Sequence, residues 1–336
     1  MKKATTLGLS VLLTLLLATC APAGVKSGAS AAEALLGLLP EGTTGVIAID
    51  VGRMMATETA VKALQDPKAQ EQYDAFVEMT GIDPTKDITY IGFGLIGLSG
   101  ADVQEGAAVL NLRYDRDKLL GLMKIKAPEL KEETYNGVVL YGNLDGEGAK
   151  QTTRAAFLDD THIVLGGAKG IERIIDVRQK KAGSLAGNAA MAAMLKKVDK
   201  SGIAWGAFAV PQELLKKGIE ATPQLRVLEG VTALTMSFDY RLATFSADIR
   251  ALGGTKEQND NLAAALNGFK ALGAMFAAQE PVAGEVLGGI EISSGADYTR
   301  IAVSLPEEVM DKLGRLAREK AGDYMKKGEA PAAEKK

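Results

Sequence analysis

Alternating apolar and polar positions mark short strands along much of the chain. The clearest case spans residues 231–251, where two alternating segments flank a short turn at 240–242. One face of this pair is apolar, and the other carries Thr235, Ser237, Asp239, Thr244, Ser246, Asp248 and Arg250. A period of two with one apolar face is typical of a half-buried antiparallel hairpin. Asp159-Asp160 joins a second such pair, over 155–158 and 161–165. The pattern predicts a mostly antiparallel sheet.

Helical periodicity separates these strands, and capping residues frame it. Asp66 followed by Pro67 predicts the start of a helix that Gly81 ends, and Asn188 predicts the start of another. Capping-box patterns precede two apolar-periodic runs, and they pair Thr255 with Gln258 and Ser304 with Glu307. Further helical stripes are expected over 168–180, 255–278 and 306–325.

The same order of elements occurs twice. A strand at 45–51 and a strand at 202–210 each lead into helix, paired strands, helix, hairpin and a final helix. We therefore expect an α+β fold of two similar domains, each a mostly antiparallel sheet with helices packed on one face. The expected segments are a signal peptide over 1–19, a flexible tether over 20–32, a first domain over 33–183, a second domain by duplication over 184–325 (its boundary near 181–188), and a disordered tail over 326–336.

The first twenty residues read as an export signal. Lys2 and Lys3 form a basic start, and the apolar run over 7–17 is too short for a settled membrane span. Leu17-Ala18-Thr19-Cys20 resembles the lipobox of bacterial lipoproteins, although Thr19 departs from the usual Gly, Ala or Ser. The resemblance implies that Cys20 is acylated, for example with palmitate, becomes the new N-terminus and anchors the chain to a membrane.

A second cleavage site overlaps the first. Ala21-Pro22-Ala23 fits the Ala-x-Ala pattern, and a cut after Ala23 would discard Cys20 and release a soluble secreted protein. Cys20 is the only cysteine in the chain, which favours a dedicated use of it. Lipoproteins kept at the inner membrane often have Asp where this chain has Ala21. The resemblance therefore implies the periplasmic side of the outer membrane if the organism is Gram-negative.

Composition excludes several classes of function. With 47% hydrophobic and 24% charged residues, the chain is typical of globular proteins. Its formal charge of −3 becomes −5 once Lys2 and Lys3 are removed, so charge gives no reason to expect nucleic-acid binding. The absence of cysteine after Cys20 excludes internal disulfides.

Three longer segments resemble uncharacterised bacterial envelope lipoproteins with a duplicated α+β domain. They are the stretch from Leu39-Pro40-Glu41-Gly42 through Asp50, the stretch 135–141, and the stretch 156–166. These motifs are patterns of apolar residues and turns. The resemblance implies a location and an architecture, and it carries no catalytic residue.

Most candidate cofactor and catalytic motifs are absent or lack the neighbouring elements that they need. Gly92–Gly97 spells G-x-G-x-x-G, but a strand rather than a helix follows it, so a dinucleotide site is not expected. Neither a Gly-Lys dipeptide nor a G-x-S-x-G motif is present, which excludes a Walker A loop and a nucleophile elbow. His162, the single histidine, lies beside Asp159-Asp160 and is expected on a hairpin surface.

Metal sites are equally weakly supported. One histidine and one lipidated cysteine are too few for an ordinary zinc or copper site. Asp115 with Asp117, and Asp145 with Glu147, are the candidate oxygen-only pairs, and neither matches a calcium-binding loop. Asp115 is better interpreted as a helix cap. We expect no cofactor.

These features favour a membrane-tethered, non-enzymatic envelope lipoprotein that acts through protein–protein contacts. Its expected partners are the membrane, through Cys20, and a protein of the cell envelope. The alternative is a periplasmic carrier or sensor of a lipid or another apolar ligand, lined by the helix over 263–278 with its Leu266, Phe269, Met275 and Phe276. An enzyme built on carboxylates, hydroxyls or lysine is the third hypothesis, and no residue stands out for it.

Overall fold

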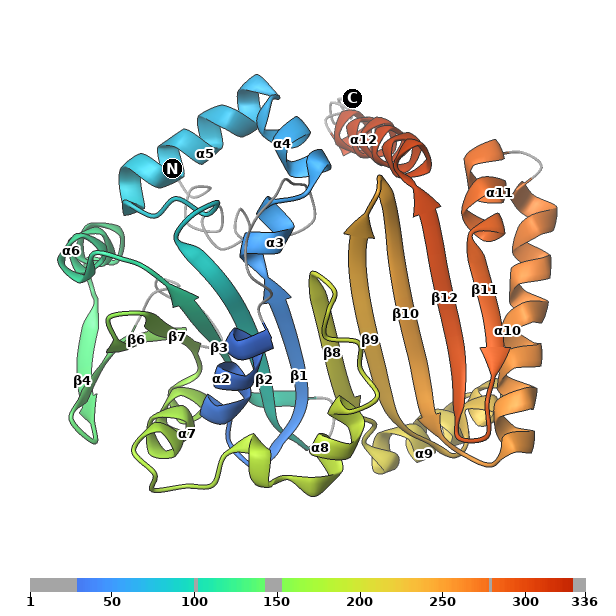
Figure 1. The fold of residues 1–336 in the computed structure, drawn as a ribbon, viewed down its shortest axis with the longest axis horizontal. Coiled ribbons are helices and arrows are strands. Elements are labelled where there is room, and N and C mark those ends of the chain that lie inside the picture. The colour runs from blue at the N-terminus through green and yellow to red at the C-terminus, as the bar shows by residue number, and fades with distance from the viewer. Residues whose placement is uncertain (1–28, 100–101, 143–152, 278–279, 329–336) are drawn as a thin grey trace, which may run out of the picture.

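The computed structural model describes residues 29–99, 102–142, 153–277 and 280–328, and these residues build one sheet (Figure 1). Within them, twelve antiparallel strands follow the spatial order β11-β12-β10-β9-β8-β1-β2-β3-β7-β6-β5-β4. The strands are β1 (Thr43–Asp50), β2 (Ile88–Ser99), β3 (Asp102–Leu112), β4 (Lys131–Tyr135), β5 (Val138–Gly142), β6 (Arg154–Asp159), β7 (His162–Gly166), β8 (Ala204–Ala209), β9 (Val231–Arg241), β10 (Thr244–Gly253), β11 (Ile290–Ser294) and β12 (Tyr298–Pro306).

Helices flank the sheet on both faces and at its margins. They are α2 (Ala29–Leu38), α3 (Val51–Met55), α4 (Glu58–Leu64), α5 (Pro67–Thr80), α6 (Arg116–Lys126), α7 (Ala168–Arg178), α8 (Ala189–Leu195), α9 (Gln212–Ala221), α10 (Lys256–Phe276), α11 (Pro281–Gly288) and α12 (Glu307–Gly328), with 3₁₀ turns at Leu185–Gly187 and Pro223–Leu228. None of the helices in the described ranges combines the length and the apolar character that a membrane span needs.

The predicted α+β class with an antiparallel sheet is confirmed. The first half of the chain supplies β1 to β7 and the second half supplies β8 to β12, and β1 pairs with β8 to join them into one sheet. Outward from this join, the order is β1-β2-β3-β7-β6 on one side and β8-β9-β10-β12-β11 on the other. The duplication and its boundary stay predictions, and β4 and β5 extend the first half alone.

In the first half, both faces of the sheet are buried except at the edge strand β4. Val46, Val109 and Val164 point to the face covered by α2, α7 and α8, where three isoleucines of α7 are almost fully buried. Their strand neighbours point to the opposite face, against α3, α5 and α6. Because side chains alternate along a strand, a strand buried on both faces has few polar positions. This explains the continuous apolar runs in β1 and β3.

Trp205 of β8 holds the join between the halves. Its side chain is 1% exposed and belongs to the same buried cluster as Leu35, Val46 and Ile174 of the first half. The indole Nε1 donates a 2.8 Å hydrogen bond to the buried hydroxyl of Tyr90 on β2. Burial raises the pKa of the Tyr90 hydroxyl, which therefore stays protonated.

The second half buries its two sheet faces unequally. On one face, β9, β10 and β12 carry the predicted apolar positions, and α10 packs there against β11 and β12. Thr299 of β12 anchors this packing, because its buried hydroxyl donates to the backbone carbonyl of Asn259 in α10. On the opposite face, hydroxyl and charged side chains are only partly buried. That open polar face forms the candidate site.

Most of the predicted helix signals are confirmed. Asp66, Asn188 and Thr255 accept hydrogen bonds from the first-turn backbone of α5, α8 and α10, and Gly81 ends α5 with a left-handed φ of 75°. The capping box at Ser304 is wrong. Ser304 lies inside β12, which continues to Pro306, and the backbone N–H of Glu307 donates to Ala243 instead.

Two boundaries differ from the prediction, and two elements were missed. The tether over 20–32 is too long, because α2 begins at Ala29, in an alanine-rich stretch that favours helix. The tail from 326 is also too long, since α12 continues to Gly328. Helix α11 was missed, and the hairpin expected before the final helix begins only after it, at Ile290. Strand β4 was also missed, because its Lys-Glu-Glu-Thr-Tyr sequence is charged and exposed.

Candidate functional site

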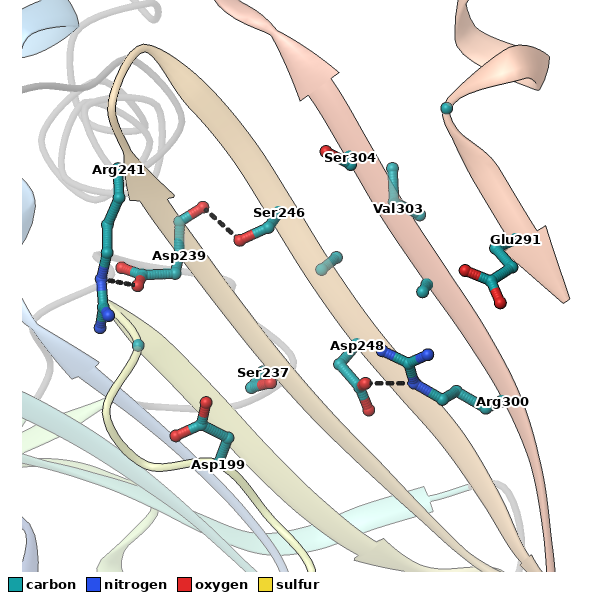
Figure 2. A pocket seen from close by; sticks show the side chains of 14 residues that line it. Asp199, Ser237, Asp239, Arg241, Ser246, Asp248, Glu291, Arg300, Val303 and Ser304 are labelled. Carbon is teal, nitrogen blue, oxygen red and sulfur yellow. Dashed lines mark hydrogen bonds and ion pairs between the residues drawn. The ribbon is translucent and has the colours of Figure 1, made fainter. Parts of the chain in front are cut away.

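A hollow of about 490 Å³ lies on the open polar face of the second half (Figure 2). Directly opposed residues of antiparallel strands share a face, so the strand registers place the lining side chains. Ser246 opposes both Asp239 and Ser304, and Asp248 opposes both Ser237 and Ala302. Small side chains thus form the floor, and charged side chains stand around it.

Asp248 and Arg300 form the lower wall in Figure 2, and Arg250 supports Asp248 from outside the lining. Arg250 donates to Asp248 over 2.7 Å, and Arg300 of the next strand donates over 2.5 Å. Partial burial raises the pKa of Asp248, but the hydrogen bonds from Arg250 and Arg300 outweigh it, so the pKa is lowered and the carboxylate stays ionised. Cross-strand ion pairs of this kind stabilise a half-exposed sheet face. Their charges are already paired.

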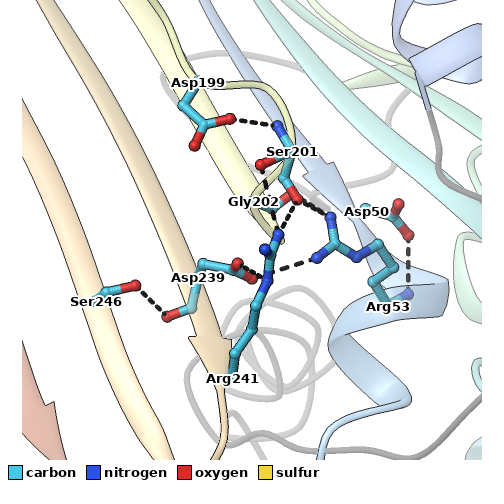
Figure 3. A network of polar contacts seen from close by, with 8 residues as sticks. All are labelled: Asp50, Arg53, Asp199, Ser201, Gly202, Asp239, Arg241 and Ser246. Atoms are coloured by element: carbon cyan, nitrogen blue, oxygen red, sulfur yellow. Dashed lines mark hydrogen bonds and ion pairs between the residues drawn. The ribbon is translucent and has the colours of Figure 1, made fainter.

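A second polar network closes the hollow on the side of the join (Figure 3). Arg53 of α3 reaches across from the first half and donates to the backbone carbonyls of Ser201 and Gly202. Arg241 of β9 also donates to the Ser201 carbonyl, over 3.0 Å, and both guanidinium groups contact the Asp239 carboxylate. Two arginines therefore fix the loop that precedes β8 to the end of β9.

Local structure positions each member of this network. The Asp50 side chain caps α3 by accepting a hydrogen bond from the backbone N–H of Arg53 over 2.8 Å. This contact fixes the backbone from which the Arg53 side chain extends. Asp199 accepts from the backbone N–H of Ser201 over 2.9 Å. Hydrogen bonds from Ser201, with a further contribution from the charge of Arg241, lower the pKa of Asp199.

The charges that line the hollow do not cancel. Four lining carboxylates face two lining arginines, which gives a formal charge of −2: the acids are Asp199, Asp239, Asp248 and Glu291, and the arginines are Arg241 and Arg300. Among the described residues, the side chain of Glu291 on edge strand β11 has no ion-pair or hydrogen-bond partner, while its backbone lies opposite Ala302 of β12. Its carboxylate extends beside the small-residue floor in Figure 2. Such a surface attracts a cationic group and offers serine hydroxyls beside it.

His162 lies apart from this hollow, in the hairpin where it was predicted. Its Nδ1 lies 2.8 Å from Asp159, and its Nε2 lies 3.0 Å from the amide nitrogen of Asn111. Arg178 also pairs with Asp159, over 2.6 Å. Both ring nitrogens thus have protein partners, which is typical of a structural histidine.

The G-x-G-x-x-G motif serves packing. Gly92 and Gly94 lie within β2, and no helix follows the motif. A Cβ atom at Gly92 would lie 2.1 Å from the Leu35 side chain, and one at Gly94 would lie 2.7 Å from Leu39. The missing side chains let α2 lie directly on the strand. This is the close approach that glycine in a strand allows.

The other predicted candidates are not brought together. Asp115 is the N-cap of α6 and accepts from the backbone N–H of Lys118 over 3.0 Å, as predicted. Asp145, Glu147 and the lipidation candidate Cys20, with its competing cleavage site at Ala23, lie outside the described residues. No group of three or more potential metal ligands exists among the residues that the structure describes.

The sequence revealed half of the hollow. The polar positions of β9 and β10 were predicted to share a wet face. Arg300 and Ser304 were missed, although β12 alternates in the same way, with Arg300, Ala302 and Ser304 against Ile301, Val303 and Leu305. Arg53 gave no sequence signal, because its partners lie in the other half of the chain.

Comparisons with known proteins give a distant likeness only. No family model matches the chain, and no curated protein matches it. Three solved structures of a protein named TP0453 are similar to it, in crystal forms III, I and IV. Their identities are 11%, 11% and 10%, with TM-scores of 0.45, 0.42 and 0.41. The matches cover 85%, 86% and 83% of this chain and 96%, 96% and 95% of the other. We carry no property of TP0453 over to this chain.

Proposed function

We propose that this chain is an envelope lipoprotein, anchored through Cys20, that binds a cationic segment of a partner protein in the hollow of its second half and has no enzymatic activity. The hollow carries the proposal. It combines a net negative lining, the unpartnered Glu291 carboxylate and a floor of small hydroxyl-bearing residues. A basic side chain of a partner fits such a floor, because it gains a charge-assisted hydrogen bond without displacing an existing ion pair.

The rigid surroundings of the hollow support binding over catalysis. Asp239 and Asp248 are each held by two arginines, so both carboxylates already serve in ion pairs of the protein itself. The resemblance of Leu17-Ala18-Thr19-Cys20 to a lipobox supports the anchor. An anchored protein would act on partners that reach the same membrane surface.

Site-specific photo-crosslinking in cells tests the binding site. A photoreactive amino acid at Ser304, on the hollow, should capture one defined protein, whereas the same amino acid at exposed Thr232 on β9 should not. Glu291→Lys should abolish the capture, and Glu280→Lys, which reverses an exposed charge outside the hollow, should leave it intact. Equal products from both positions, or capture that survives Glu291→Lys, would contradict the proposal.

Intact mass spectrometry tests the anchor separately. The chain isolated from host membranes should begin at Cys20 and carry the mass of two or three acyl chains, and Cys20→Ser should remain unprocessed or appear in the soluble fraction. A chain that begins at Gly24 would show that cleavage follows Ala23 and that no anchor exists.

A carrier of an apolar ligand is the second candidate, and the partly exposed apolar face of the second half favours it. Phe238 and Ile249 are among the half-buried side chains there. Two of the large residues that were expected to line a cavity face outward instead: on α10, Phe269 is 67% exposed and Met275 is 74% exposed. Native mass spectrometry of the full chain decides this: a reproducible excess mass of a lipid supports the carrier, and its absence contradicts it.

A further inference from the structure

The outward face of α10 carries no charge over four turns. Nine residues between 261 and 275 are exposed, and all are uncharged: Asn261, Ala264, Asn267, Gly268, Phe269, Ala271, Leu272, Ala274 and Met275. The only charged residue in this stretch is Lys270, whose ammonium group is turned inward and donates to the Ile290 carbonyl. Exposed helix faces are normally polar. Figure 1 places α10 at the outer margin of the sheet, beyond β11.

The large and small residues of this face have a symmetric spacing. Asn261, Ala264, Gly268, Leu272 and Met275 follow intervals of three, four, four and three, so they form one seam along the helix. A twofold axis at Gly268 brings Leu272 against Ala264 of a second copy and Met275 against Asn261. Each large side chain therefore meets a smaller one, and glycine lies where two helix backbones approach most closely.

We propose that two copies of this chain associate through this seam, with their α10 helices packed antiparallel about Gly268. A twofold axis presents the same face from both copies, so any charged residue on the seam would occur twice within it, and the two like charges would repel each other. The charge-free face meets this requirement.

The surroundings of the seam favour a second copy over a bilayer surface. Helices that lie on membranes flank their apolar face with lysine and arginine, which attract anionic headgroups. Here the exposed charged residues at the two ends include Glu257, Asp260 and Glu280, and Lys256 is paired with Asp260 over 2.8 Å. The ends of the face are thus net acidic.

The size of the seam sets the strength of the contact. A stable interface uses about 20–30 residues a side, whereas the seam has five residues and the whole exposed face of α10 between 261 and 275 has nine. We therefore expect a weak dimer in dilute solution and a populated one where copies are concentrated at a membrane surface.

Cysteine crosslinking of the full chain in host membranes tests the seam. Gly268→Cys should form a disulfide with its own copy under mild oxidation, because a residue on the axis meets itself. Gly121→Cys on α6 is the matched control, since both glycines are helical and a Cβ at either position meets no atom within 4 Å. The unmodified chain controls for Cys20. Equal dimer from Gly268→Cys and Gly121→Cys would overturn the proposal.

Two further experiments test the register and the chemistry of the seam. Differently tagged Ala264→Cys and Leu272→Cys chains should crosslink to each other more than either does to itself, and the reverse result would overturn the antiparallel seam. Leu272→Asp should lower Gly268→Cys crosslinking about tenfold or more, since each copy would bury an unpaired carboxylate against Ala264 of the other. Ile125→Asp, at a residue 75% exposed on α6, should not.

The same cysteine also reports other occupants. An environment-sensitive dye on Gly268→Cys that shifts to the blue on vesicles of phosphatidylcholine and phosphatidylglycerol, with no crosslinked dimer, would replace the second copy with the bilayer. A disulfide to a different protein alone would overturn self-association.

Discussion

Two hairpins of this chain make the same turn with opposite residue choices. Asn136 and Gly137 join β4 to β5 with φ values of 48° and 80°, and Leu242 and Ala243 join β9 to β10 with φ values of 50° and 55°. Positive φ at both central residues is the requirement of a type I′ turn, for which Asn-Gly is strongly preferred. For leucine or alanine, the left-handed backbone conformation costs about 1–2 kcal/mol of conformational free energy per residue. The second turn is therefore strained.

We predict that Leu242→Asn combined with Ala243→Gly stabilises the protein by about 1–2 kcal/mol. Relief of two strained residues contributes roughly 2 kcal/mol or more, and the greater freedom of glycine in the unfolded chain subtracts about 0.5–1 kcal/mol. Little packing is lost at Leu242, whose side chain is 99% exposed. The hydrogen bonds at this turn, from Thr244 and Glu307, go to backbone carbonyls that the variants keep.

Urea unfolding followed by Trp205 fluorescence measures the change, with Gly137→Ala as the reciprocal variant. A Cβ atom at Gly137 meets nothing within 4 Å, so this substitution adds backbone strain alone and should destabilise by about 1 kcal/mol. The reasoning is refuted if Gly137→Ala destabilises as expected while the Leu242 and Ala243 variant is no more stable than the parent chain.

Three further predictions concern other parts of the fold. Gly92→Ala should destabilise by about 1–3 kcal/mol in urea unfolding, because its methyl group overlaps Leu35, and Leu35→Ala should cost less in that background than alone. Burial and a hydrogen bond to Asp83 raise the pKa of Tyr73 to about 12, above its ordinary value of 10. The folded protein thus keeps a proton that the unfolded chain loses, and this stabilisation disappears as the pH rises from about 10 to 12. Tyr73→Phe should flatten that part of the stability profile, and an unchanged slope would contradict it. Arg53→Ala should speed amide hydrogen exchange in the loop before β8, while Arg53→Lys should restore it only in part, because lysine lacks the forked donors.

Local signals predicted the local parts of the fold. The hairpin of β9 and β10 was predicted with its polar face, because alternation and a tight turn lie within one short segment. The caps at Asp66, Asn188 and Thr255 were predicted for the same reason, since each contact spans three residues or fewer. At Ser304 the same four-residue pattern failed, because pairing of β12 with β10 continued the strand past it.

Parts that depend on distant contacts could not be predicted in this way. Strand β4 has no apolar period, and its place as an edge strand comes from pairing with β5. Arg53 lies 186 positions from Asp239, and a lone arginine on a short helix carries no sign of such a partner. No sequence pattern marked Glu291 as a binding residue either. Its carboxylate is unpaired because of the residues that lie beside it on β12, and the sequence alone does not show which residues these are.

The buried contacts at the join between the halves cross the predicted boundary between the two domains. Trp205, Met191 and Leu195 follow the predicted boundary, yet all three lie in one buried cluster with Leu35 and Ile174, which precede it. A first half cut at 183 would expose the apolar surface of that cluster and the hydrogen-bonding edge of β1. Burying a side chain such as Leu35 stabilises by about 1.5–3 kcal/mol, which is a large share of a typical domain's stability. Residues of the segment 185–207 therefore complete the core of the first half, and the strands that form the hollow continue the same sheet outward from β8.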